Sequence, residues 1–247
     1  MCIRDRKNTM KKQVVIQAGG KGKRLRPHTY VLPKPLMPLG DSTLLETNIK
    51  WLCKNGVVNQ IITLGYLGHL ISAIIDNGSQ YGAEIDYYSE EKPLGTAGSL
   101  VNLVDELEDH FLLMNGDLVV DLDIDKFKET HLDNNYDITV GAFTTQHQID
   151  YGVLGLDDRK LLKTFDEKPE IDTLVAMGVY FINKKVVSHI PSGSPFGMDN
   201  LINQVLKDGG RVGIFHHQGI WLDIGRLKEL SNIQEEYSRI ESLLLGI

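Results

Sequence analysis

Apolar positions along the chain follow two periods, one typical of buried strands and one typical of amphipathic helices. Short runs rich in β-branched and aromatic residues predict strands at residues 13–17, 61–64, 85–88, 111–114, 138–143 and 175–182. Helical spacing predicts helices that begin near Thr43 and Gly68, and others over residues 97–107, 124–134 and 198–207. This alternation indicates an α/β fold with an open, mostly parallel (mixed) sheet and helices on both faces.

The last predicted helix has the clearest pattern, because its apolar residues form one stripe: Leu227, Leu230, Ile233, Tyr237, Ile240 and Leu244. No proline- or glycine-rich linker interrupts the chain, so we expect a single domain over residues 10–247. Residues 1–9 are interpreted as a non-native or disordered lead. The first six residues have no apolar core, which argues against a secretory signal.

Residues 55–75 carry no formal charge and match a membrane span in length. The same segment contains several polar side chains and glycines, so we interpret it as a strand, a Gly-Tyr-Leu-Gly loop and a helix. We therefore expect no membrane partner.

Composition narrows the class of protein further. The 247 residues include 26 basic and 33 acidic side chains, a net charge of −7. An acidic protein lacks the positive surface field that a nucleic-acid backbone requires, so we expect no nucleic-acid partner. Cys2 and Cys53 are too few for a disulfide framework or a zinc site, and they fit a cytoplasmic location. A homo-oligomer is compatible with this composition.

A glycine-rich turn at residues 17–27 follows the first predicted strand. Consecutive glycines allow backbone N–H groups to converge on an anion. Five basic and no acidic residues lie between positions 13 and 40, whereas 16 basic and 32 acidic residues follow. Such a basic island favours a polyphosphate ligand, with a solvated basic loop as the plain alternative. Gln17 and Arg24 break the Walker pattern, and Leu25 replaces the third glycine of the dinucleotide fingerprint.

Several motifs resemble, in order, those of the sugar-phosphate nucleotidylyltransferases, also called NDP-sugar pyrophosphorylases. Residues 19–29 (GGKGKRLRPHT) and 33–35 (PKP) are similar to the family form GGxGTRLxPLT followed by PKP, with Lys23 and His28 in place of the common Thr and Leu. Further similar segments are residues 90–98 (EEKPLGTAG), 115–117 (NGD), 151–153 (YGV), 167–169 (EKP), 177–180 (MGVY) and 221–225 (WLDIG).

The resemblance implies a Rossmann-like nucleotide-diphospho-sugar transferase fold and a reaction in which a nucleoside triphosphate and a sugar 1-phosphate give an NDP-sugar and pyrophosphate. It is nearest to enzymes of the mannose-1-phosphate guanylyltransferase type, so GTP is the expected nucleotide, and UTP, dTTP and CTP remain open. Because the reaction brings two polyanions together, it requires positioning, cations and a metal more than a Ser-His-Asp triad.

By the same resemblance, Arg24, Lys34 and Lys168 are the expected catalytic residues. The implied nucleotide-binding residues are Ala18, Gly19, Gly20, Gly22, Glu90, Gly95 and Thr96. The implied sugar-phosphate contacts are Gly152, Glu167, Lys168 and Gly178. Asp117 and Asp223 are the implied ligands of Mg²⁺, the expected cofactor.

Some polar residues in these segments also have plainer structural interpretations. An aspartate after an apolar run also caps turns or helices, and we expect Asp121 and Asp123 to cap the helix that follows them. His216 and His217 are adjacent on a predicted strand and face opposite ways, so they are not expected to bind a metal.

The same residues bear on two other classes of protein. A catalytically silent, NDP-sugar-binding regulatory module is expected to lack Arg24, Lys34 or one of the metal aspartates, and this chain has them all. A nicotinamide-dependent oxidoreductase is disfavoured by the missing third glycine of the dinucleotide fingerprint.

Overall fold

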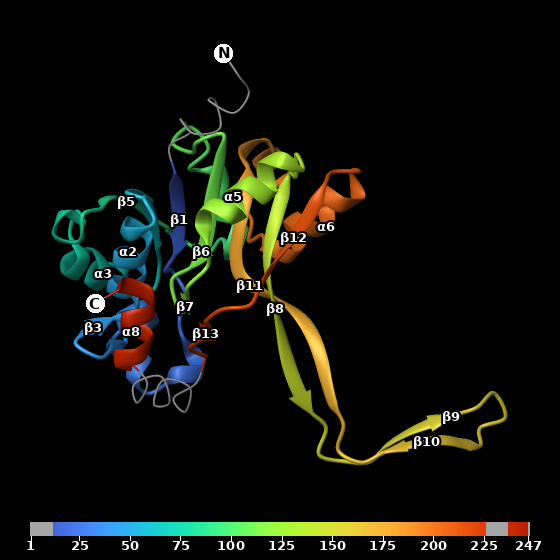
Figure 1. The fold of residues 1–247 in the computed structure, drawn as a ribbon. Helices are drawn as coiled ribbons and strands as arrows, with labels where there is room; N and C mark the ends of the chain where they lie inside the picture. Colours follow the sequence, from blue (N-terminus) through green and yellow to red (C-terminus); the bar gives the residue numbers. More distant parts are fainter. Residues whose placement is uncertain (1–11, 226–236, 247) are drawn as a thin grey trace.

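A seven-stranded sheet forms the centre of the molecule in a computed structural model, which describes residues 12–225 and 237–246 (Figure 1). Its strands are β1 (Gln13–Gln17), β4 (Asn59–Leu64), β5 (Glu84–Ser89), β6 (His110–Asn115), β8 (Ile138–Gln148), β11 (Glu170–Asn183) and β12 (Val212–His217). Their order across the sheet is β12-β8-β11-β6-β1-β4-β5. Only β11 runs against its neighbours, so the sheet is mixed and mostly parallel, as the sequence predicts.

Helices cover both faces of this sheet, because the side chains of each strand alternate between two apolar cores. Val14 and Ile16 of β1 enter one core, and Val15 enters the other. The first core is covered by α2 (Leu44–Lys54), α3 (Gly68–Ile75), α5 (Ile124–Asp133) and α8 (Tyr237–Leu245). The second is covered by α6 (Met198–Lys207) and two 3-10 helices, η5 (Ser99–Val101) and η6 (Lys184–His189). The predicted fold class is confirmed.

Most predicted helices are present. α2 begins with a capping box in which Glu46 N–H donates to the Thr43 hydroxyl and Thr43 N–H donates to the Glu46 carboxylate. Tyr237, Ile240 and Leu244 of the C-terminal stripe are buried in α8. The other three members of that stripe, Leu227, Leu230 and Ile233, lie outside the described residues.

The helix predicted over residues 97–107 is wrong. The chain forms a single turn, α4 (Gly95–Gly98), followed by η5 and a series of turns. Leu100 and Leu103 are both buried, and Leu103 N–H donates to the carbonyl of Leu100 at 3.2 Å. Tight 3-10 turns also place residues three positions apart on the same face. This spacing alone therefore does not distinguish them from an α-helix.

Two strands continue well beyond the sheet and form an arm. The outer parts of β8 and β11 lead to an antiparallel hairpin made of β9 (Val153–Leu156) and β10 (Leu162–Asp166). We call residues 144–176 the arm, and Figure 1 shows it extending away from the helices and the rest of the sheet. The ladder between β8 and β11 runs without interruption from the pair Gln148–Glu170 to the pair Ala142–Ala176.

A small antiparallel pair lies beside the main sheet and brings two distant segments together. β7 (Leu118–Val120) pairs with β13 (Trp221–Asp223), and Asp223 stands opposite Leu118. The buried side chain of Asn48 on α2 donates to the carbonyl of Leu118 at 2.8 Å and so fixes this pair to the first core. The remaining short elements are β2 (Pro38–Leu39), β3 (Ser42–Thr43), η1 (Lys23–Leu25), η2 (His28–Tyr30), η3 (Lys34–Leu36) and η4 (Ser79–Tyr81).

Candidate active site

The carboxyl ends of three adjacent strands present a row of polar side chains. Gln17 at the end of β1 is in register with Thr63 of β4 on one side and with Asn115 of β6 on the other. All three residues line a pocket of about 400 Å³, which we call the larger pocket. The chain leaves β1 for β4 on one side and later returns to β6 on the other. In open α/β sheets, ligands bind at such a reversal of strand order.

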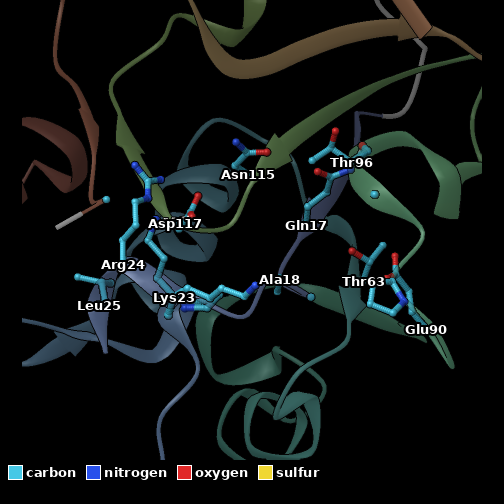
Figure 2. Close-up of a pocket in the computed structure, with 18 residues that line it drawn as sticks. Gln17, Ala18, Lys23, Arg24, Leu25, Thr63, Glu90, Thr96, Asn115 and Asp117 are labelled. Carbon is cyan, nitrogen blue, oxygen red and sulfur yellow. Dashed lines mark hydrogen bonds and ion pairs between the residues drawn. The ribbon is translucent and has the colours of Figure 1, made fainter. Parts of the chain in front are cut away.

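The glycine-rich turn after β1 forms one wall of the larger pocket. Its conformation depends on Gly22, whose φ is 53°, and a Cβ there would approach Thr29 Cγ2 to 2.9 Å. The Thr29 hydroxyl donates to the carbonyl of Gly22, and buried Leu25 anchors the turn in the first core. Exposed Lys23 and Arg24 also line the pocket. Figure 2 shows Arg24 on the same side of the pocket as Asp117, and Thr96 and Glu90 on the opposite side.

The wall formed by residues 90–98 is attached to the segment before α6. The N–H groups of Ala97 and Gly98 donate to the carbonyl of Phe196, at 2.9 and 3.1 Å. The Thr96 hydroxyl accepts from Met198 N–H at 2.9 Å, and the Thr96 carbonyl accepts from the Gln17 side chain. These contacts fix Gly95 and Thr96 in the wall of the larger pocket.

Glu90 lines the same wall and is partly withdrawn from water. Its carboxylate accepts from Leu94 N–H at 3.2 Å, and burial raises the pKa of Glu90 above its ordinary value although that hydrogen bond lowers it. Glu90 therefore holds the loop that leads to Gly95 and is one of the residues that line the larger pocket.

A buried lysine and two aspartates meet at the edge of the larger pocket. Lys34, only 6% exposed, places Nζ 2.5 Å from Oδ2 of Asp117 and 3.8 Å from Oδ1 of Asp223. The three residues come from η3, from the turn between β6 and β7, and from the end of β13. Pairing with carboxylates offsets the cost of burying the lysine ammonium. The structure thus brings together Lys34, Asp117 and Asp223, which the sequence analysis assigns to catalysis and metal binding.

A second, smaller pocket of about 150 Å³ shares Asn115 and Asp117 with the larger one. Gly178 lies at this boundary with φ of 77°, and a Cβ there would approach Nδ2 of Asn115 to 2.5 Å. The Trp221 indole N–H donates to the carbonyl of Met177 at 3.0 Å and so joins β13 to β11. The residues that line this smaller pocket are Asn115, Asp117, Leu118, Ala176, Met177, Gly178, Tyr180, Trp221 and Asp223.

Most of the residues expected to bind nucleotide or sugar lie at these two pockets. The larger pocket is lined by Ala18, Gly19, Gly20, Gly22, Arg24, Lys34, Glu90, Gly95, Thr96 and Asp117, and the smaller one by Gly178, Asp117 and Asp223. Gly152, Glu167 and Lys168 do not line either pocket. They lie on the arm, where a Cβ at Gly152 would meet Phe165 and the Glu167 carboxylate.

Several lining residues were not assigned as site residues from the sequence. Gln17, Thr63 and Asn115 share one signal, which is a polar residue at the end of a buried apolar strand. Lys23 stands in the basic turn beside Arg24. Tyr180 and Trp221 belong to the motif segments 177–180 and 221–225, but the smaller pocket that they line forms only when β11 and β13 meet.

The two aspartates that follow β7 have different roles. Asp123 caps α5 by accepting from Lys126 N–H, as expected. The expectation for Asp121 is wrong, because its carboxylate accepts from Ile220 N–H at 2.6 Å and lies 2.9 Å from Nε2 of His217. A long-range contact with the segment before β13 therefore replaces the local cap. His216 points elsewhere, with Nε2 2.9 Å from the Thr144 hydroxyl.

The chemistry of Asp117 and Asp223 suits a hard divalent cation. Mg²⁺ is bound by one or two carboxylates and completes its octahedral shell with water and substrate phosphates. Asp117 and Asp223 fit this donor set, because their two carboxylates lie close enough together to approach one ammonium group, that of Lys34. They also lie beside a pocket with exposed cationic side chains. Among the described residues, no three or more His, Cys, Asp or Glu side chains are grouped as a metal site.

Comparison with solved structures supports the fold. HddC from Yersinia pseudotuberculosis, also solved as a complex with GMP-PN, superposes with a TM-score of 0.73 at 25% identity, covering 92% of this chain and 99% of that chain. The molecule thus has the Rossmann-like fold of NDP-sugar transferases. Within the described residues, helices are all too short or too polar to cross a membrane.

Sequence comparison then gives the family. The profile of the family described as Nucleotidyl transferase matches residues 13–239, so the chain belongs to that family. A UTP–glucose-1-phosphate uridylyltransferase from Synechocystis is 27% identical over 88% of this chain and 61% of its own length. A mannose-1-phosphate guanylyltransferase from Mycobacterium tuberculosis is 29% identical over 85% of this chain and 60% of its length. The chain therefore spans about three fifths of these curated relatives.

Proposed function

We propose that this protein transfers a nucleotidyl group from a nucleoside triphosphate to a sugar 1-phosphate, with Mg²⁺ as cofactor and an NDP-sugar and pyrophosphate as products. The observation that carries the proposal is the boundary between the two pockets. Two substrates that react with each other require adjoining sites, and here a buried cation and two carboxylates lie where a larger and a smaller pocket meet. We assign the nucleotide to the larger pocket and the sugar phosphate to the smaller one.

The reaction needs positioning more than a base. An oxygen of the sugar phosphate forms a bond to the α-phosphorus of the nucleotide, and the bond from that phosphorus to the bridging oxygen of the β-phosphate breaks. Pyrophosphate leaves with the electron pair. A phosphate monoester has a second pKa of about 6, so the nucleophile is already largely dianionic at neutral pH. What limits the rate is the approach of two polyanions, which oriented cations offset.

Each cationic residue then has a distinct role. Arg24, exposed on the glycine-rich turn, holds the triphosphate and stabilises the leaving pyrophosphate, because its planar fork matches two phosphate oxygens. Lys34 is rigid and buried, so its ammonium provides a fixed positive charge beside the reacting phosphates. Backbone N–H groups of the turn at Gly19 and Gly20 approach the phosphates without hindrance from a Cβ.

The aspartates would hold the metal. Asp117 and Asp223 supply the two carboxylates, and the bound Mg²⁺ would neutralise developing charge on the phosphate oxygens. Glu90, Gly95 and Thr96 form the wall on the far side of the larger pocket from Arg24, which suits contact with the nucleoside (Figure 2).

GTP is the proposed nucleotide, with mannose 1-phosphate or a related sugar phosphate as acceptor. The mycobacterial relative is a guanylyltransferase, and HddC was solved with a guanine nucleotide analogue. The Synechocystis relative is a uridylyltransferase of similar identity, so the base must be measured directly. A role in polysaccharide precursor synthesis in the cytoplasm follows from such a product.

The test is release of pyrophosphate by the purified chain. With Mg²⁺, four nucleoside triphosphates and a panel of sugar 1-phosphates, we expect turnover with one preferred pair and none without the sugar phosphate. Thermal shifts with each nucleotide identify the base, because a ligand that binds the folded state raises the melting temperature. A chain that binds an NDP-sugar yet releases no pyrophosphate with any pair would instead be the regulatory module considered above.

A further inference from the structure

A very short antiparallel ladder carries the two carboxylates that approach Lys34. Asp117 directly precedes β7, and Asp223 is the last residue of β13, the strand that pairs with β7 (Figure 1). A slip of one residue between these strands would turn the Asp223 side chain to the other face and move it by about 3.4 Å. Because Asp223 Oδ1 lies 3.8 Å from Lys34 Nζ, the register of the ladder decides whether this carboxylate reaches the site.

The opposite end of the ladder is held by another carboxylate, that of Asp121. Asp121 N–H donates to the carbonyl of Ile220 at 3.3 Å, which continues the ladder by one pair. In return, Ile220 N–H donates to Oδ1 of the Asp121 side chain at 2.6 Å. A hydrogen bond to an ionised acceptor is roughly twice as strong as one between neutral groups. Asp121 therefore fixes the residue that precedes β13 opposite itself.

His217, the last residue of β12, contacts the same carboxylate. Its Nε2 lies 2.9 Å from Oδ1 of Asp121 and 3.1 Å from the carbonyl oxygen of Ile220. Both neighbours are acceptors, so Nε2 carries the proton and donates it. The imidazole is buried, and its centroid lies 6.3 Å from that of the Phe143 ring on β8. His217 thus ties the main sheet to the segment that leads into β13.

The link from β12 to β13 is built closely around this contact. Residues 218–220 join the two strands. A Cβ at Gly219 would collide with Oδ1 of Asp121 and would come within 2.7 Å of Cε1 of His217, so the close approach requires glycine. So short a link leaves little slack, and the contact between Asp121 and His217 therefore sets the point at which β13 begins.

Asp121 and His217 line neither pocket, so they act on the site only through the two strands. A polar pair withdrawn from water costs more to desolvate than an apolar pair of the same size. An apolar contact at this position would stabilise the fold as well. Hydrogen bonds differ from it because they depend on distance and angle, and they therefore distinguish one register from the next.

We propose that Asp121 and His217 are positioning residues that fix the register of β13 on β7. By this means they hold Asp223 beside Asp117 and Lys34. Without this contact β13 shifts or frays and its carboxylate leaves the site, whereas Asp117 stays because it follows β6, which lies in the interior of the main sheet. The consequence for metal binding rests on the proposed function, and the consequence for the ladder does not.

Hydrogen exchange tests the ladder without any measurement of activity. Ile224 N–H donates to the carbonyl of Asp117 at 3.4 Å, so the segment of residues 220–224 reports on the whole ladder. Asp121→Ala should make this segment exchange about tenfold faster and leave β1 and β6 unchanged. Asp123→Ala is the matched control, because it removes the cap of α5 and no contact with β13. Its segment 220–224 should exchange at the wild-type rate.

Two substitutions at His217 separate its hydrogen bond from its packing. His217→Gln keeps an N–H donor near the position of Nε2, so exchange in residues 220–224 should stay close to that of the wild type. His217→Phe keeps an aromatic ring beside Phe143 and has no donor, so it should exchange as fast as Asp121→Ala does. Equal exchange in the two variants overturns the role of the imidazole N–H.

The Mg²⁺ dependence of pyrophosphate release tests the positioning of Asp223. In Asp121→Ala, the Mg²⁺ concentration that gives half of the maximal rate should rise by about tenfold, since residues that support metal ligands change affinity by about 10- to 100-fold. Saturating Mg²⁺ should restore most of the rate, which a simple loss of folded protein would not allow. Asp123→Ala should keep the wild-type Mg²⁺ requirement.

Each outcome decides a different part of the proposal. Wild-type exchange of residues 220–224 in Asp121→Ala overturns the role in the ladder. Fast exchange with an unchanged Mg²⁺ requirement overturns the positioning of Asp223. A wild-type chain that releases no pyrophosphate overturns the proposed function, and hydrogen exchange still decides the ladder. If Asp121→Ala does not fold, Asp121→Asn replaces it, since it keeps an oxygen acceptor without the charge and should show the same changes to a smaller extent.

Discussion

Lys34 Nζ lies 2.5 Å from Oδ2 of Asp117, although the two residues are 83 positions apart in the chain. The contact joins the segment after the glycine-rich turn to the turn after β6, and both segments line the larger pocket. A buried ammonium in this position is held by the fold, so it does not need to be ordered when substrate binds. Preorganised charge of this kind is what reactions between anions require.

Lys34→Met tests that fixed charge. We expect the rate of pyrophosphate release to fall by about 10²- to 10³-fold, the range typical for loss of one preorganised electrostatic contact. The melting temperature should also fall, because Asp117 and Asp223 lose their shared cation. Lys126→Met is the control, since Lys126 forms an exposed ion pair with Asp123 and should have little effect. Equal rates for both variants would contradict the role of Lys34.

Asp223→Asn tests the carboxylate from β13. Mutation of a residue that hydrogen-bonds to a metal ligand typically lowers metal affinity or activity by about 10- to 100-fold. Loss of a ligand itself should therefore reduce turnover by at least about 100-fold. Asp223 is half exposed, so the fold should persist, as circular dichroism can check. Asp105→Asn changes an exposed aspartate outside both pockets and should retain the full rate. An Asp223→Asn enzyme with normal turnover at all Mg²⁺ concentrations refutes the assignment.

Arg24→Ala and Arg26→Ala form a matched pair within one turn. Arg24 lines the larger pocket, whereas the Arg26 guanidinium lies over the ring of Tyr30 at 4.9 Å and does not line it. We expect Arg24→Ala to lower kcat by about 10³-fold, as loss of an arginine on a transferred phosphoryl group does. Arg26→Ala should change kcat little. If Arg24→Ala alters only the KM for the sugar phosphate, the arginine has been assigned to the wrong substrate.

Gly178→Ala tests the boundary between the two pockets. Gly178 and Gly193 both have positive φ, of 77° and 74°, which costs an alanine about 1–2 kcal/mol. Only at Gly178 does a Cβ meet another residue, Nδ2 of Asn115, at 2.5 Å, whereas nothing lies within 4 Å of a Cβ at Gly193. Both variants should therefore lose stability, and only Gly178→Ala should raise the KM for sugar phosphate. Similar kinetics in the two variants would argue against a substrate role for this boundary.

The stability of the fold should depend on pH through His131. This histidine is fully buried on α5, with Nε2 2.9 Å from His110 Nδ1 and Nδ1 2.8 Å from the Thr139 hydroxyl. Burial, reinforced by His110, lowers the pKa of His131 from 6.5 to about 3. Between pH 6.5 and 3 the unfolded chain binds a proton at this residue and the folded chain does not. The free energy of unfolding should therefore fall as the pH falls, by about 1.4 kcal/mol per pH unit.

Denaturant unfolding at several pH values checks this linkage. His131→Gln should have a smaller loss of stability between pH 6.5 and 4.5 than the wild type has. Thr139→Val removes the hydrogen bond and keeps the histidine, so it should lower stability at every pH with the wild-type slope. Identical slopes in the wild type and His131→Gln would show that His131 is not the group responsible.

The local pattern of apolar residues was enough to predict the elements that are buried in the core. Runs of apolar residues predicted β1, β4 and β6, because a strand that is buried on both faces does not alternate between apolar and polar residues. The turn after β1 was equally visible, since glycines and basic residues there follow a strand end. Lys34, Asp117 and Asp223 were named from motif resemblance, and their convergence could be known only from the pairing of β7 with β13.

The arm was not predicted, because its sequence has no clear strand pattern. Residues 170–174 mix charged and apolar side chains that face water on both sides, so neither strand period stands out. Their pairing with residues 144–148 depends on a partner strand more than 20 positions away. The same limit applies to Asp121, whose long-range contact with Ile220 N–H replaces the local cap that its sequence suggests.

The arm has no buried residues, so changes in its length should have little effect on the stability of the fold. Residues 144–176 can lengthen or shorten at the β9–β10 turn with little thermodynamic effect, since each doubling of a loop costs only about 0.6 kcal/mol. The polar row of Asn115, Gln17 and Thr63 has no such freedom, because it depends on the register of three buried strands. Mutation can therefore change the length and sequence of the hairpin while the polar row that lines the larger pocket stays constant.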